Sequence, residues 1–179
     1  KSGAGRIDLN PANTYAGLTT VTGGDLEVGP TGSIGGVLLN NASASLGGTG
    51  TVGSVTGFPS ATGTIDPGLN SAGTVGTLNT GSLSFGANTA LRFNLQSLGS
   101  ADKIFSSGSV SLNGATLTGV VGAGVNVGDQ FTIVQTSGTP ISGRFAEPFG
   151  AGIAFINGRK FNVDYTDPTK VVLTLVQTT

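Results

Sequence analysis

The sequence predicts an all-β protein built as a β-solenoid of stacked coils, and three observations support this prediction. The first is composition: 32 of the 179 residues are glycine, and no window of a dozen residues escapes Gly, Pro or dense Thr, Ser and Val, which disfavour helices. The second is a series of short runs in which apolar and polar residues alternate. The third is the return of similar motifs at a nearly fixed spacing, which is typical of repeat proteins.

Runs bounded by Gly, Asn, Asp and Ser mark the expected strands along the chain. In each run, aliphatic or aromatic residues face one side and polar residues face the other, as in a strand with one buried face. A hydrophobic content of 37% favours an ordered chain over a disordered one. The expected strands are residues 18–22, 25–28, 51–56, 82–85, 90–95, 109–112, 115–118, 130–134 and 171–176.

The spacing of the motifs favours a solenoid over a sandwich or a closed barrel. Leu26, Leu46 and Ile65 follow one another at almost equal intervals, in similar surroundings of small residues. Later, the run at 81–85 returns at 108–112. Coils of about 20 residues would number nine in this chain and form a rod on the order of 40 Å long.

The C-terminal segment carries a different signal. Asn157-Gly158 lies between two alternating runs, which is the strongest short-range signal for a β-hairpin. We therefore expect antiparallel strands from about residue 153 to residue 176, which would close the end of the solenoid. The predicted division is residues 1–150 as β-solenoid coils and residues 151–179 as a C-terminal hairpin cap.

Composition and charge exclude several function classes. The chain has no Cys and no His, which removes disulfides, Cys/His zinc sites and His-assisted catalysis. Eight basic and nine acidic residues are scattered singly, so no basic stripe is available to bind nucleic acid. No apolar run reaches the length of a membrane helix, so we expect no membrane insertion.

The remaining candidates for chemistry are carboxylates, and their surroundings indicate structural roles. Asp102 and Lys103 are neighbours in an alternating strand, so they should point to opposite faces. Asp164 and Asp167 precede turn residues and are expected to form turns. A calcium site needs six or more oxygens, and Asp66 with Asn70 would supply two. We therefore expect no enzyme activity, no catalytic residue, no cofactor and no metal.

Residues 5–28 resemble the passenger-associated transport repeat, also called the autotransporter-associated β-strand repeat. In that family a polar Asn-Thr-Tyr-x-Gly corner leads to a Thr-rich strand and then to Gly-x-Leu. Here Asn13, Thr14, Tyr15 and Gly17 match the corner, and residues 24–26 match the closing strand. Segments 44–52, 65–74, 101–104, 112–117, 128–133 and 141–145 resemble the parts that follow in autotransporter passengers.

The resemblance implies a right-handed parallel β-helix, located outside the cell or on a bacterial surface, with a structural or adhesive role. The outer-membrane barrel that ends proteins of this family does not occur within the sequence. It also implies that the chain is part of a secreted passenger and acts as an adhesin stalk or a fibre subunit.

The unpaired strands at the two ends of a solenoid suggest self-association, since an open sheet edge can recruit another strand. The first strand carries Arg6 and Asp8, whereas the final run has no charge from Val171 to Val176. We therefore predict that a second copy binds head to tail and that filaments form. The residues expected to carry this contact are Ile7, Leu9, Val171, Leu173 and Leu175.

Two other functions remain open on the sequence alone. A β-helix that binds or cleaves polysaccharides, including cell-surface glycans, would need Lys, Arg or carboxylates clustered on one face. Arg92 and Lys103 lie about half a coil apart and could begin such a cluster. An inert spacer would differ from a fibre subunit only in having no affinity for itself.

Overall fold

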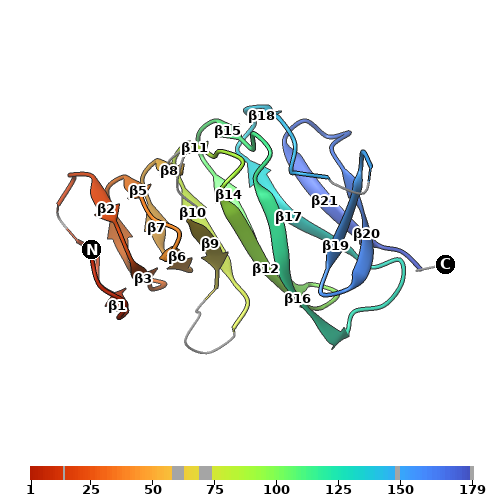
Figure 1. The fold of residues 1–179 in the computed structure, drawn as a ribbon, viewed down its shortest axis with the longest axis horizontal. Coiled ribbons are helices and arrows are strands. Elements are labelled where there is room, and N and C mark those ends of the chain that lie inside the picture. The colour runs from red at the N-terminus through yellow and green to blue at the C-terminus, as the bar shows by residue number, and fades with distance from the viewer. Residues whose placement is uncertain (14, 58–62, 69–73, 148–149, 178–179) are drawn as a thin grey trace.

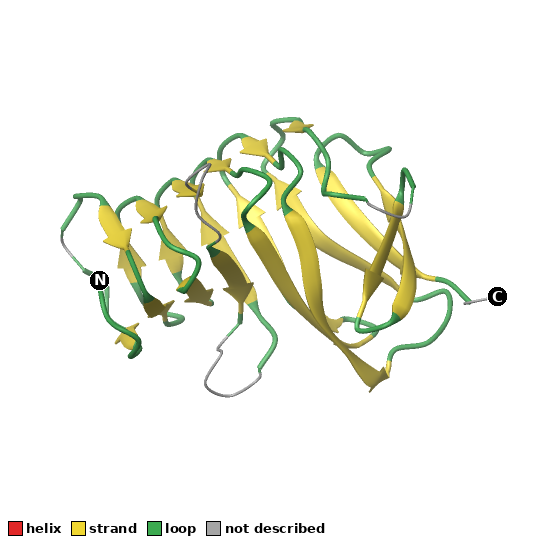
Figure 2. Ribbon diagram, in the orientation of Figure 1, coloured by secondary structure: helices red, strands yellow, loops and turns green. Residues whose placement is uncertain are grey.

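The computed structural model describes residues 1–179 except 14, 58–62, 69–73, 148–149 and 178–179. The described residues form strands, turns and loops and contain no helix (Figure 2). Successive coils of backbone stack along the long axis of the molecule from the N-terminus onward (Figure 1). The predicted all-β parallel β-helix is confirmed. Thr14, which matched the repeat corner, lies outside the described residues.

Three sheets form the walls of the β-helix, and we name them A, B and C. Sheet A contains β1 (Ile7–Leu9), β3 (Gly24–Val28), β6 (Ala44–Gly48), β9 (Thr64–Pro67), β12 (Ala90–Ser97) and β16 (Thr116–Gly124), with β13 (Ser100–Ala101) antiparallel to β12. Sheet C contains β2 (Thr19–Val21), β5 (Val37–Leu39), β8 (Val55–Gly57), β11 (Leu83–Ser84), β15 (Val110–Ser111) and β18 (Ile141–Ser142), all parallel.

Sheet B combines a parallel part with an antiparallel end. Its parallel strands are β4 (Ser33–Ile34), β7 (Thr51–Val52), β10 (Thr77–Thr80), β14 (Lys103–Ser106) and β17 (Gln130–Thr136). The sheet continues with antiparallel β21 (Lys170–Leu175), β20 (Arg159–Asp164) and β19 (Ile153–Ile156). Each full coil runs from sheet A to sheet B to sheet C, as β3, β4 and β5 do.

The repeat seen in the sequence is the register of sheet A. Leu26 pairs with Leu46, and Leu46 pairs with Ile65, so the predicted spacing is the spacing of neighbouring coils. The column continues to Leu91 and then to Leu117, with a wider spacing at both steps. Within the described residues, sheet A stacks six strands in parallel. The expectation of nine coils is therefore wrong, because the later coils are longer than about 20 residues and the last strands are antiparallel.

The inward side chains of the three sheets form one continuous core. Val21, Leu46, Leu78 and Phe93 are fully buried and come from all three walls. Apolar side chains therefore stack on the same type of side chain in the next coil, and each coil covers its neighbour. Burial of this kind is what stabilises a solenoid, since no single coil can cover its own apolar face.

Glycines allow the chain to turn from sheet B to sheet C. Residues 51–56, expected as one strand, are two strands in different sheets that are separated by a corner at Gly53 and Ser54. A Cβ on Gly53 would lie 2.9 Å from the carbonyl carbon of Gly35 in the previous coil. A Cβ on Gly81 would lie 3.0 Å from the amide nitrogen of Ser54. Small corner residues therefore keep neighbouring coils at strand-pairing distance.

The predicted C-terminal hairpin is confirmed. β19 and β20 are antiparallel and are joined by Asn157 and Gly158, whose φ angles are 49° and 74°. Two consecutive positive φ angles are those of a type I′ turn, which matches the twist of the flanking strands. The hairpin and β21 cover the last coil with buried side chains that include Ile156, Phe161 and Leu173.

Candidate functional site

The N-terminal end of the helix contains the first pair of residues predicted to self-associate. Ile7 and Leu9 lie in β1, which pairs with β3 on one side and ends sheet A on the other. Ile7 is 44% exposed although it belongs to the core column, and Leu9 is half-buried against the core. Among the described residues, β1 is therefore an edge strand with an exposed apolar residue.

The C-terminal half of the predicted contact is arranged differently. Val171, Leu173 and Leu175 are buried in β21, which pairs with β17 on one edge and with β20 on the other. The expectation that this uncharged strand leaves a free edge is wrong. The turn at residues 165–169 brings the final strand back between two others, and a strand in that position needs no charges to protect its edges.

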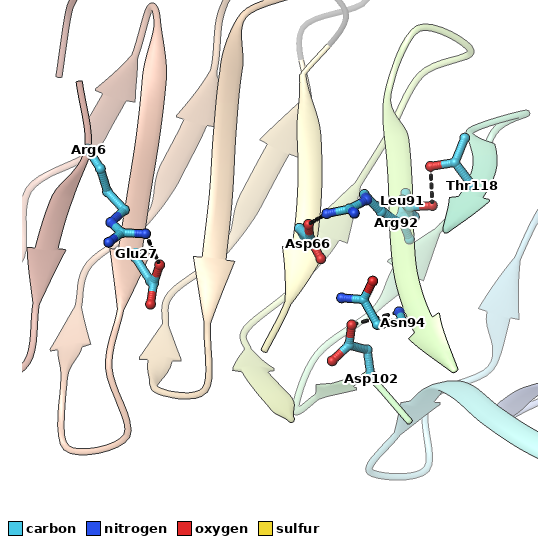
Figure 3. A network of polar contacts seen from close by, with 8 residues as sticks. All are labelled: Arg6, Glu27, Asp66, Leu91, Arg92, Asn94, Asp102 and Thr118. Atoms are coloured by element: carbon cyan, nitrogen blue, oxygen red, sulfur yellow. Dashed lines mark hydrogen bonds and ion pairs between the residues drawn. The ribbon is translucent and has the colours of Figure 1, made fainter. Parts of the chain in front are cut away.

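Charged residues gather on the outer face of sheet A, where two ion pairs connect neighbouring coils (Figure 3). Arg6 Nη1 lies 3.3 Å from Glu27 Oε2, and Arg92 Nη1 pairs with Asp66 Oδ2. Both carboxylates are buried although they lie on the outer face. Burial raises the pKa of Asp66, and the hydrogen bond from Arg92 partly offsets this effect. The first pair joins the residue directly before β1 to β3, and the second joins β9 to β12.

Asp102 is a fully buried carboxylate at the junction of sheets A and B. Its Oδ1 accepts a hydrogen bond from the amide of Gly76 at 2.9 Å, and its Oδ2 accepts one from the amide of Asn94 at 2.7 Å. Burial raises the pKa of Asp102 to about 6, because desolvation outweighs both hydrogen bonds. The carboxylate fixes the segment before β10 against β12, which is a structural role.

Lys103 points away from Asp102, as the alternation predicted. Its ammonium group donates a hydrogen bond to the amide oxygen of Gln135 in the next coil. It lines an open groove of about 260 Å³ on sheet B together with Thr77 and Thr132. Arg92 is on sheet A and is paired with Asp66, so the structure does not bring Arg92 and Lys103 into one cluster.

The two remaining predicted carboxylates form turns. Asp164 Oδ1 accepts a hydrogen bond from the amide of Thr166, and Asp167 Oδ1 accepts one from the amide of Thr169. Both hydrogen bonds stabilise the ionised form, and each lowers the pKa of its carboxyl group. The turn that they shape returns the chain from β20 to β21.

A polar cluster that the sequence did not indicate holds the loop before the hairpin. The Tyr165 hydroxyl donates to Glu147 Oε1 at 2.8 Å and accepts from the amide of Phe145 at 3.2 Å. Glu147 Oε2 accepts from the amide of Gly152 at 2.7 Å, and the Arg144 guanidinium lies 4.7 Å from the centre of the Tyr165 ring. Tyr165 lies 18 residues after Glu147 in the sequence, and no repeat relates the members of this cluster.

Replacing Tyr165 with phenylalanine should lower the free energy of unfolding by about 1 to 3 kcal/mol, because the change removes the hydroxyl that bonds Glu147 Oε1 and the Phe145 amide. Urea denaturation measures the change. Tyr15→Phe is the matched control, since Tyr15 is 43% exposed and its substitution should alter stability by less than about 0.5 kcal/mol. Equal losses for the two variants would contradict a role for the Tyr165 hydroxyl.

The described residues contain no group of three or more acidic side chains arranged to hold a metal ion. A search of the same residues for a long apolar helix of membrane-spanning length also finds none. The polar residues of the candidate sites join coils, shape turns or hold the cap, and their contacts indicate structural roles.

Comparison with known proteins supports the resemblance inferred from the sequence. No curated protein matches the chain. The family model of the passenger-associated-transport-repeat matches residues 1–28, which form the first coil and the strand β3 that begins the second. Repeats of this family are typical of autotransporter passengers, which are secreted to the cell surface or beyond it. The first coil of this parallel β-helix is therefore similar to the passenger-associated-transport-repeat.

Proposed function

We propose that this chain is a structural rod of an extracellular autotransporter passenger on a bacterial surface, where it serves as an adhesin stalk or a self-associating structural subunit. The proposal assigns no reaction, cofactor or metal to the chain. It rests on the repeat at residues 1–28 and on the continuity of the helix from that repeat to the C-terminal hairpin.

One observation carries the proposal: a single apolar core and successive strand ladders connect the two ends of the molecule. A solenoid of this type resists bending, since each coil is bonded to both neighbours along three walls. Its charged residues reinforce the same connections, as Arg92 does when it joins β12 to Asp66 in β9. Rigidity over distance is the property that a stalk needs.

Removal of one whole coil should shorten the rod and leave it folded. Deleting residues 27–46 connects Leu26 to Gly47 and keeps the register of sheet A, because Leu26 and Leu46 occupy equivalent positions. Single cysteines at Leu18 and Leu98, which are 65% and 67% exposed, would carry spin labels in a chain that has no cysteine of its own. Double electron–electron resonance should show one narrow distribution of distances between the two spin labels. The mean distance should be about 5 Å shorter in the deletion variant than in the intact chain.

Deleting residues 27–45 is the matched control. It leaves Leu46 directly after Leu26, so the side chain of Leu46 turns to the outer face of sheet A. This variant should lose the cooperative unfolding transition that the deletion of 27–46 keeps. A broad distance distribution in the intact chain, or equal behaviour of the two deletions, would contradict a rigid rod. If an antibody against this chain fails to label intact cells that produce it, the surface location is contradicted.

A further inference from the structure

The outer edge of β1 presents backbone groups that have no partner strand among the described residues. The carbonyl of Leu9 accepts a hydrogen bond from the amide of Gly29 at 3.1 Å, so Leu9 directs its backbone groups toward the next coil. Backbone groups alternate in direction along a strand. Ile7 therefore also faces the next coil, whereas Arg6 and Asp8 direct their amides and carbonyls away from the helix.

The side chains of this edge combine two opposite charges with an apolar residue. Ile7 stacks on Leu26 in the core column, and no coil among the described residues covers it from the other side. Arg6 and Asp8 lie on the opposite face of the strand, with Arg6 Nε 2.8 Å from Asp8 Oδ1, and both remain solvent-accessible. Arg6, directly before β1, and Ile7 and Asp8, within it, thus present a positive, an apolar and a negative side chain in that order.

This order is self-complementary when two copies of the strand meet antiparallel. If Ile7 of one copy lies opposite Ile7 of the other, Arg6 of each copy lies opposite Asp8 of the second copy. These are the residues whose backbone groups point outward, and each such pair exchanges two hydrogen bonds. Opposite charges across an antiparallel pair are favourable, and the two Ile7 side chains would cover each other.

The opposite end of sheet A offers no equivalent edge for head-to-tail pairing within the part of the chain that the structure describes. β19 of the hairpin packs against β16, the last strand of that sheet. Arg159 Nη2 donates to the carbonyl of Val125 at 2.9 Å, and its Nη1 donates to the carbonyl of Gly122 at 3.5 Å. A covered end favours a closed two-fold contact between N-terminal ends over an open filament.

We infer that two copies of this chain associate through antiparallel pairing of β1 with β1 of the second copy, centred on Ile7. The inference rests on the structural role proposed above and names its partner. It keeps Ile7 of the predicted contact and replaces head-to-tail growth with a discrete dimer. The N-terminal ends of the two rods would then face each other.

Charge reversal tests the register of this pairing. In Arg6→Asp, two carboxylates face each other across the interface, and in Asp8→Arg, two guanidinium groups do. Sedimentation equilibrium should show that each variant alone dimerises at least about tenfold more weakly than the original chain, since like charges directly opposite are destabilising. An equimolar mixture of the two variants should recover dimers, because each new charge then faces its opposite. Asp164→Arg, at the far end, should leave dimerisation unchanged.

A cysteine at position 7 gives a second measurement that keeps Arg6 and its contact with Glu27 intact. The chain has no native cysteine, so Ile7→Cys can form only one kind of disulfide, between two copies. Mild oxidation should link Ile7→Cys at least tenfold faster than Leu18→Cys, which lies at the same end but outside the strand. A closely opposed non-hydrogen-bonded pair has the short Cβ separation that a disulfide requires.

Three results would overturn the inference. They are a chain that stays monomeric to about 1 mM, a mass that grows past the dimer with concentration, and a mixture of the charge variants that associates no better than either alone. None of them would affect the distance change expected on coil deletion, so failure of the dimer and failure of the rod are distinguishable. Equal cross-linking at positions 7 and 18 would likewise count against the proposed register.

Discussion

Gly48→Ala should destabilise the protein by about 4 kcal/mol or more, which is among the largest effects expected of a single methyl group. Gly48 is buried in β6 with a φ of +113°, a conformation that side chains disfavour. A Cβ there would lie 2.0 Å from the carbonyl oxygen of Val28 in the previous coil. Because the group that a Cβ would meet is backbone, relief requires the two coils to separate. Urea denaturation of the two proteins measures the difference.

Gly17→Ala is the control for this substitution. A Cβ on Gly17 has no atom within 4 Å, and the residue does not have a positive φ angle, so the change should be within about 0.5 kcal/mol or slightly stabilising. Gly48 is also joined to Gly68 by reciprocal amide–carbonyl hydrogen bonds of 2.7 and 3.1 Å. An alanine variant with an unchanged denaturation midpoint would show that neighbouring coils are not packed at backbone contact.

The sequence carried enough information to predict the stacking of coils, because the core column is built from residues of one type at one spacing. Leu26, Leu46 and Ile65 stand out for this reason, and Asn157-Gly158 does so because a type I′ turn restricts its residues strongly. Both signals are local or periodic. Features of this kind can be recognised without knowing where any other part of the chain lies.

Other features depend on contacts that no periodic pattern encodes. Residues 51–56 alternate like one strand, yet Gly53 turns the chain into a second wall, since alternation does not reveal the corner between two short strands. The ion pair of Arg92 with Asp66 joins positions separated by the same step as Leu91 and Ile65. It could have been found only by recognising that the coils lengthen after Ile65.

The position of β21 could not be predicted from its composition. An uncharged strand fits either an exposed adhesive edge or the interior of a sheet, and the place of this run at the end of the sequence favours the edge. The turn after Asp164 inserts it between β17 and β20. Order along the chain and order across a sheet coincide in a simple solenoid but differ once the chain reverses.

The free energy of unfolding should fall by roughly 3 kcal/mol through Asp102 alone as the pH rises from well below the ordinary pKa of an aspartate to above 6. An Asp in the unfolded chain has a pKa of 3.8, and burial raises that of Asp102 to about 6. Between these values the folded protein retains a proton that the unfolded chain has released, so the contribution is stabilising at low pH and is lost as the pH increases through 6. Nearby Asp66 acts in the same direction, because its pKa is also raised.

Asp102→Asn removes this titration, so the difference in unfolding free energy between the original chain and the variant should change with pH mainly between 4 and 6. The asparagine can accept one of the amide hydrogen bonds from Gly76 and Asn94, but its NH₂ group faces the other donor, which makes the variant less stable than the original chain at pH 4. Asp164→Asn provides a control of opposite sign. The pKa of exposed Asp164 is lowered, so its ionised form stabilises the folded protein, and this contribution is lost as the pH falls below the ordinary pKa of an aspartate. Parallel pH profiles of the original chain and Asp102→Asn would show that the buried carboxylate does not titrate in this range.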